Sequence, residues 1–103
     1  MAGELYRQGD VLIRRIDRLP RKKSVKRASG HILEGEATGH IHRVEELTKA
    51  EVLEIENRLY LRVGPEGVRI IHEEHASITL PAGNYEIVRQ REFSPEAIRN
   101  VMD

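Results

Sequence analysis

The sequence predicts an all-β fold, a small antiparallel barrel or sandwich of about seven or eight strands that forms one β-barrel domain over residues 1–103. Short apolar segments alternate with a period of two, and turns containing Gly or Pro separate them at nearly regular intervals. Helix-forming stretches are scarce. The chain has three Tyr, one Phe and no Trp, so its core must be mainly aliphatic.

In the N-terminal half, a strand is expected from Gly9 to Ile16, where apolar residues follow a Gln-Gly turn signal. Residues 17–30 show no periodicity and carry many cations, which is typical of a long solvated loop. Extended segments are expected from His31 to Glu36 and from Thr38 to Glu45, close to two glycines.

The central hairpin has the clearest pattern in the chain. Residues 52–55 and 58–63 both alternate, and Glu56-Asn57 between them suits a tight turn. Strong turn signals follow at Gly64 to Gly67 and at Pro81 to Asn84. Around these turns, further strands are expected over residues 68–72, 76–80 and 85–93.

Two stretches carry helical signals. Residues 44–53 contain several helix formers, and Thr48 is suited to cap a turn there. Near the end of the chain, Ser94 is a good N-cap and Pro95 fits the first helical position. A short C-terminal helix is therefore expected over residues 95–102.

The formal net charge of zero conceals an asymmetry. Residues 1–30 hold nine Lys and Arg against three Asp and Glu, whereas residues 31–103 hold eight against fourteen. The basic loop at 17–30 contributes Lys22, Lys23, Lys26 and Arg27. A basic arm on an acidic body favours either a polyanionic partner, such as nucleic acid, or self-association into a homo-oligomer.

The composition also narrows the surroundings expected for the protein. The chain has no Cys, so disulfides and thiolate ligands are excluded, and the reducing cytoplasm is the expected compartment. No apolar run approaches the roughly 20 residues that a membrane-spanning helix needs, and the first residues contain no apolar signal region. Any metal must be held by nitrogen and oxygen donors.

Four of the five histidines form two pairs, and these pairs are the most informative local feature. On a strand, His40 and His42 would point to the same face, because side chains alternate with a period of two. His72 and His75 would converge only if the Glu73-Glu74 between them breaks the strand. A turn at Glu73-Glu74 is therefore the geometric condition for a single site that unites the two pairs.

Imidazole and carboxylate donors with an open position are typical of a metal site that binds or activates a substrate. The leading hypothesis is a metal-dependent hydrolase, holding a divalent transition metal such as Zn, Mn, Ni or Fe. The substrate would be a phosphorylated small molecule or a nucleic acid. The candidate metal ligands are His40, His42, His72, His75 and Glu46. Candidate catalytic residues are the four histidines with Glu73 and Glu74, and candidate substrate-binding residues are Arg43, Arg91, Lys22, Lys23, Lys26 and Arg27.

Two other functions fit the same residues. In a metal-free ribonuclease, one neutral and one protonated imidazole would act as general base and general acid on a phosphodiester. In a binding module without catalysis, the basic loop would hold nucleic acid or a protein partner, and the histidines would be structural.

The segment around His40-Ile41-His42 resembles the first motif of the cupin family, with Glu46 three residues further on, and Pro81-Ala82-Gly83 resembles the second. This resemblance implies a small β-barrel in which His40, His42 and Glu46 are metal ligands. Two residues depart from the family pattern. Gly35 lies one residue closer to His40 than in that pattern, and Glu86 stands where the family has its fourth metal ligand.

The same triplet is similar to the His-hydrophobic-His motif of rolling-circle nucleases. That resemblance implies a nucleophilic tyrosine, for which Tyr85 and Tyr60 are the candidates. The chain as a whole also looks like small uncharacterised prokaryotic and phage proteins, a likeness that implies no activity.

Overall fold

The computed structural model describes residues 3–34 and 41–89, and within these ranges the chain is all-β. The strands of the larger sheet are β1 (Leu5–Gln8), β2 (Val11–Ile16), β3 (Ser24–Lys26), β6 (Ala50–Ile55), β7 (Arg58–Val63) and β10 (Gly83–Arg89). The strands of the smaller sheet are β4 (His31–Glu34), β5 (Ile41–Val44), β8 (Val68–Ile71) and β9 (Ile78–Leu80). No helix in the described ranges is long and apolar enough to cross a membrane.

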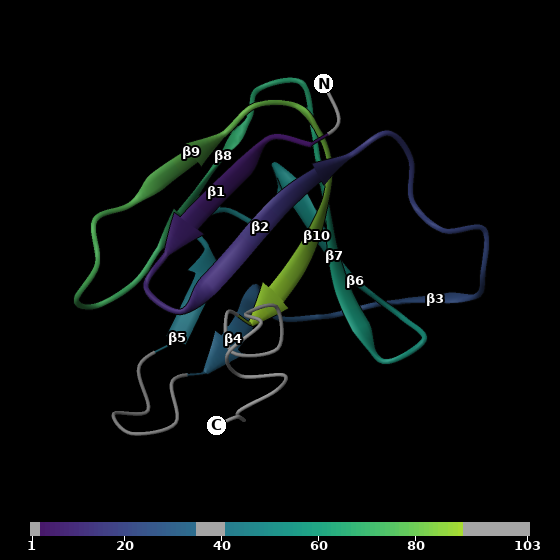
Figure 1. Ribbon diagram of the computed structural model, residues 1–103, viewed down its shortest axis with the longest axis horizontal. Helices are drawn as coiled ribbons and strands as arrows, with labels where there is room; N and C mark the ends of the chain where they lie inside the picture. Colours follow the sequence, from purple (N-terminus) through teal and green to yellow (C-terminus); the bar gives the residue numbers. More distant parts are fainter. Residues whose placement is uncertain (1–2, 35–40, 90–103) are drawn as a thin grey trace, which may run out of the picture.

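Both sheets are antiparallel, in the orders β1-β2-β10-β7-β6-β3 and β4-β5-β8-β9 (Figure 1). Each remains an open sheet, because the edge strands β1, β3, β4 and β9 have no further strand beside them among the described residues. Of the two predicted architectures, barrel or sandwich, the barrel is not formed, and the chain folds as two antiparallel sheets. The described part contains ten strands instead of seven or eight. The two strands that the sequence did not predict, β1 and β3, account for this difference.

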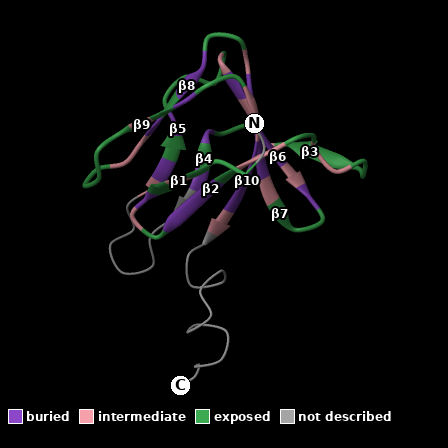
Figure 2. Cartoon of the chain, turned by 45° about the horizontal axis from the view of Figure 1, so that its top comes forward, coloured by how far each residue is buried: buried purple, intermediate pink, exposed green. Residues whose placement is uncertain are grey.

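The main core lies between the two sheets. Val11 and Ile13 of β2 pack in one cluster with Val44 of β5 and Ile70 of β8, and Ile13 and Ile70 are completely buried. Figure 2 shows the buried start of β2 in purple. Packing of two sheets against each other requires strands with one apolar face, which is the alternation in the sequence. The all-β prediction is confirmed.

A second, smaller apolar cluster contains Leu53, Ile55 and Tyr60, with Ile16 and Leu19 packed against it. Leu53 of β6 pairs with Tyr60 of β7. Val52, which precedes Leu53, and Leu61, which follows Tyr60, belong to the main core. Because neighbouring side chains on a strand point to opposite faces, this cluster lies on the outer face of the larger sheet. Leu19, in the loop after β2, covers part of that face.

The central hairpin confirms its prediction. β7 spans the predicted residues, and the turn residues Glu56 and Asn57 have φ of 52° and 67°. Two consecutive residues with positive φ are the mark of a type I′ turn, whose twist matches that of the flanking strands. The predicted turn at Gly64 to Gly67 is also present, and it is closed by a 3.0 Å hydrogen bond from Gly67 N to Gly64 O.

The structure corrects three other predictions. Residues 44–53 are not helical, since β5 ends at Val44, a turn covers 47–49 and β6 begins at Ala50. Pairing of β6 along β7 buries Val52 and Leu53, and this tertiary gain exceeds a weak local helix preference. β1 was not predicted, and the basic loop contains β3, which pairs with β6. The predicted helix over 95–102 lies outside the described residues.

Candidate functional site

Three histidine rings meet at one end of the smaller sheet. The ring centroids of His42 and His72 are 4.3 Å apart, those of His72 and His75 are 4.5 Å apart, and those of His42 and His75 are 6.1 Å apart. The register of β5 and β8 brings His42 and His72 together. Arg43 pairs with Ile71, and in this antiparallel pair His42, just before Arg43, lies opposite His72, just after Ile71. His42 is 1% exposed and belongs to the protein interior.

The chain bends at Glu73 to His75, where the sequence required a break for the histidines to converge. His72 Nδ1 accepts hydrogen bonds from the backbone N–H of Glu74 at 3.0 Å and of His75 at 3.3 Å. Glu73 Oε1 accepts from the N–H of Ile41 at 3.1 Å, which fastens the bend to β5. These contacts place the His75 ring beside those of His42 and His72.

A buried glutamine fixes the protonation of His42. The Gln8 side-chain amide donates to the carbonyl oxygens of Ile70 and Ala76, both at 2.9 Å. These two bonds show which end of the amide is the nitrogen. The Gln8 Oε1 oxygen must therefore face His42 Nδ1, 2.9 Å away. An amide oxygen only accepts, so His42 carries its proton on Nδ1 and has a lone pair on Nε2. A ring held in this way is typical of metal ligands and of general bases.

His72 has the opposite arrangement. Its Nδ1 accepts two backbone N–H groups, so the neutral ring must carry its proton on Nε2. Neighbouring rings therefore present one Nε2 that accepts, on His42, and one that donates, on His72. This distribution makes His72 a poor metal ligand, because ligation through Nε2 would require that proton to leave.

The lone pair of His42 lies near a carboxylate. His42 Nε2 is 3.6 Å from Asp10 Oδ1, in the turn between β1 and β2, and the Asp10 side chain is 56% exposed. The pKa of His42 is lowered to about 4, mainly by burial and then by His72, with a smaller contribution from His75, whereas Asp10 acts in the opposite direction. The imidazole is therefore neutral at pH 7.

A glycine makes room for the third ring. Gly9 has a φ of +61°, and a Cβ added there would lie 2.5 Å from His75 Nε2, well inside van der Waals contact. Only a residue without a side chain allows the turn between β1 and β2 to approach His75 so closely. The turn thus brings Gly9 and Asp10 to the histidine cluster.

The structure separates several predicted site residues from this cluster. The Glu46 carboxylate contacts Lys49 Nζ at 2.9 Å, beyond the far end of β5 from His42. Arg43 is exposed on β5, between the buried His42 and Val44. His40 and Arg91 lie outside the described residues. Within the described ranges, no group of three or more His, Cys, Asp or Glu side chains is arranged to hold a metal ion.

Acidic side chains of the β6–β7 hairpin lie against much of the basic loop. Lys22 Nζ is 3.3 Å from Glu56, Lys26 Nζ is 3.3 Å from Glu51, and Arg27 Nη1 is 3.8 Å from Glu54. Lys23 is exposed. These ion pairs neutralise part of the excess positive charge of the first 30 residues. The pairing of β3 with β6 brings the opposite charges together.

The residues named by the family resemblances occupy other places. Glu86 is 8% exposed and binds Arg14 and Arg58 on the outer face of the larger sheet. Tyr85 is completely buried, its hydroxyl donates to the carbonyl of Pro81 at 2.6 Å, and burial raises its pKa. Burial likewise raises the pKa of Tyr60. Neither tyrosine is presented as an exposed nucleophile.

Sequence reasoning missed Gln8, Gly9 and Asp10 as site residues. The Gln8-Gly9 pair was visible only as a turn signal before a strand. Its position beside His42, 34 residues away from Gln8, depends on how the two sheets pack. A buried glutamine that binds two carbonyls and one imidazole leaves no local pattern in the sequence.

Comparison with curated proteins finds no match, and comparison with solved structures finds none either. A family model described as a domain of unknown function, DUF8820, matches residues 7–90. The matched range contains Gln8, Asp10 and the three clustered histidines. The chain belongs to this family, the domain of unknown function DUF8820.

Proposed function

We propose that this protein binds a divalent transition metal at the histidine cluster and uses it to hydrolyse a phosphate-bearing substrate. The proposal is carried by the arrangement of His42 Nε2 and Asp10 Oδ1, which lie 3.6 Å apart. Two ligand atoms at about 2.1 Å from a tetrahedral ion are roughly 3.4 Å apart. The two donors therefore have nearly the separation of neighbouring ligands.

The chemistry of His42 favours a metal over a proton. Its low pKa leaves Nε2 unprotonated at neutral pH, so an ion need displace no proton from it. The Nδ1–H donated to Gln8 is the outer hydrogen bond that orients a ligating imidazole. His75 is the proposed third ligand, since its Nε2 faces the turn that carries Asp10. Its exposed ring would have to move towards His42 and Asp10 on metal binding, because the three side chains are not yet arranged to hold an ion. With nitrogen and oxygen donors only, Zn, Mn, Ni and Fe are the candidate ions.

Hydrolysis is the reaction class that such a site favours. With His42, Asp10 and His75 as ligands, a bound metal would keep a coordination position for water and would lower the pKa of that water towards 7. Glu73 and Glu74 are exposed beside the cluster, and one of them is the proposed general base. The substrate would approach from solvent past Asp10, an exposed member of the site.

The test compares two aspartate variants of protein purified without a histidine tag. Asp10→Asn removes the proposed ligand with little change in shape, and Asp17→Asn is the matched control at an exposed position outside the site. We expect Zn, Mn, Ni or Fe to raise the melting temperature of the wild-type protein and of Asp17→Asn, with a much smaller rise for Asp10→Asn. Absence of bound metal and of any thermal shift would contradict metal binding.

One observation favours a second candidate function. The accepting Nε2 of His42 and the donating Nε2 of His72 belong to adjacent rings, which suits metal-free acid–base cleavage of RNA. The low pKa of His42 makes it a weak base at pH 7, so we place this function second. RNA cleavage that persists with a chelator and disappears in His72→Gln would favour it over the metal site.

A further inference from the structure

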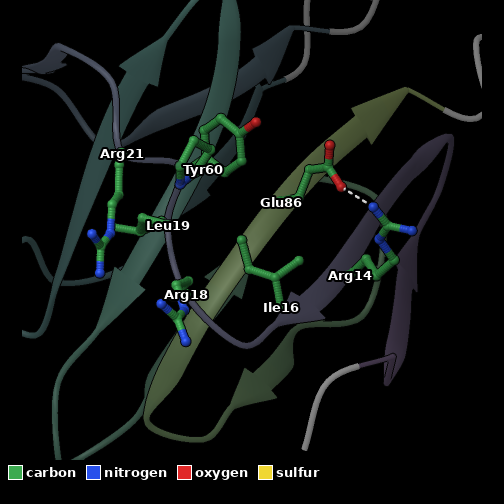
Figure 3. A pocket seen from close by; sticks show the side chains of 8 residues that line it. Arg14, Ile16, Arg18, Leu19, Arg21, Tyr60 and Glu86 are labelled. Carbon is green, nitrogen blue, oxygen red and sulfur yellow. Dashed lines mark hydrogen bonds and ion pairs between the residues drawn. The ribbon is translucent and has the colours of Figure 1, made fainter.

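One cavity in the described part of the chain lies away from the histidine cluster. It occupies about 460 Å³ on the outer face of the larger sheet, where Ile16, Tyr60 and Glu86 form its floor. The loop after β2 forms one wall with Arg18, Leu19, Pro20 and Arg21 (Figure 3). Asp10 and Ile16 are separated by the length of β2, roughly 20 Å, so this pocket is distinct from the proposed metal site.

The charges in the pocket do not cancel. The Glu86 side chain is only 10% exposed and binds two arginines, Arg14 and Arg58, the latter at 3.0 Å. Its two carboxylate oxygens are thereby occupied. Arg18 and Arg21 form no ion pair with a carboxylate in the described part of the chain. Three arginines and one glutamate line the pocket, which leaves it with a net charge of +2.

The positions of these side chains indicate what would bind. Figure 3 shows Arg21 beside Leu19 and Arg18 below it, with Arg14 and Glu86 on the opposite side of the pocket. Leu19 and Ile16 pack against the apolar cluster that contains Tyr60, and all three line the pocket, so the space between the charged groups has an apolar wall. A guanidinium group matches the planar oxygen pairs of phosphate, and two unpaired guanidiniums match the charge of a phosphate monoester.

We propose that this pocket binds a small organic phosphate monoester. The phosphate would meet Arg18 and Arg21, and the apolar part of the ligand would lie against Ile16 and Leu19. The volume falls within the range of about 300–1,000 Å³ that small-molecule sites occupy. This proposal does not depend on metal binding at His42, and either proposal stands if the other fails.

Calorimetric titration with phenyl phosphate, inorganic phosphate and phenol tests the proposal. We expect phenyl phosphate to bind at least about tenfold more tightly than either of its parts, because it alone satisfies both halves of the pocket. The variant Arg18→Gln/Arg21→Gln should lose about tenfold or more of this affinity. The variant Lys22→Gln/Lys23→Gln removes the same charge from the same loop without touching the pocket, and it should retain the affinity.

A third variant tests the apolar wall. Leu19→Ala should weaken phenyl phosphate severalfold and leave inorganic phosphate unchanged, because inorganic phosphate has no apolar part. Equal losses in the arginine and lysine variants would overturn the proposal, since they would reveal charge attraction by the whole loop. Equal affinity for phenyl phosphate and inorganic phosphate, or no binding of phenyl phosphate, would overturn it as well.

Discussion

His42 Nδ1 lies 2.9 Å from Gln8 Oε1, and both side chains are at most 2% exposed. Through this bond β1 and β5, which belong to different sheets, share a buried polar contact next to the main core. Gln8 also satisfies two backbone carbonyls, of Ile70 and Ala76, so it holds β8 and the following bend in place. The cluster geometry therefore depends on one amide.

Gln8→Leu should destabilise the protein by about 2–3 kcal/mol, because it leaves His42 Nδ1 and two carbonyl oxygens without their buried partner. Urea denaturation measures the loss. Arg7→Leu, at the exposed neighbouring position, is the control and should change stability by no more than about 0.5 kcal/mol. If Gln8→Leu were as stable as Arg7→Leu, the buried network would not have the role assigned to it.

The low pKa of His42 predicts an acid-sensitive fold in metal-free protein. The unfolded state takes up a proton near the ordinary pKa of 6.5, whereas the folded state does so only near 4, so stability is complete above 6.5 and is lost as the pH falls between these values. The shift corresponds to about 3 kcal/mol, at about 1.4 kcal/mol per pKa unit.

His42→Gln retains a partner for Gln8 and cannot titrate, so it isolates this contribution. With a chelator present, the free energy of unfolding of the wild-type protein should fall by about 3 kcal/mol more than that of the variant between pH 7 and pH 4. Parallel pH curves for the two proteins would show that His42 is not the group held neutral.

Gly9→Ala tests the close approach between the β1–β2 turn and His75. Both Gly9 and Gly3 have positive φ, but an added Cβ at Gly3 meets nothing within 4 Å, whereas at Gly9 it meets the His75 ring. Gly9→Ala should therefore displace the His75 ring and move its NMR signals. Because this exposed ring can turn aside, the variant should cost no more than about 1 kcal/mol beyond the control Gly3→Ala. Unchanged His75 signals in Gly9→Ala would place the ring elsewhere.

The hairpin turn offers a stabilising change. Glu56 and Asn57 both have positive φ, and Asn-Gly is the preferred pair for a type I′ turn. Glu56→Asn/Asn57→Gly should raise stability by about 0.5–1 kcal/mol, measured by thermal unfolding. Glu56→Gln is the control for the lost ion pair with Lys22, an exposed contact of small value. A melting temperature below that of Glu56→Gln would argue against the assigned turn.

The parts of the fold that sequence reasoning predicted are those set by local chemistry. Alternation in β7 and the turn residues Glu56-Asn57 act over a few positions, so their pattern is legible. β3 has three exposed residues and forms only because β6 lies beside it, and no local signal records such pairing. Whether the strands close into a barrel depends likewise on long-range packing.

The candidate site divides in the same way. The sequence makes a bend at Glu73-Glu74 the condition for a single site, because two histidines three residues apart cannot share a face of a strand. The structure brings His72 and His75 to His42 through such a bend. The contributions of Gln8 and Asp10 come from a distant hairpin and were not predictable.

The proposed metal site is tested most directly by the ring nitrogens of His42. Long-range proton–nitrogen NMR of uniformly labelled protein, recorded during titration with Zn²⁺, reports which nitrogen carries the proton and which binds the ion. We predict Nδ1–H with a free Nε2 in the absence of metal, and a shift of Nε2 on addition of zinc that Asp10→Asn weakens and Asp17→Asn does not. A proton on Nε2 of His42, or ring signals unchanged by zinc, would contradict the proposed site.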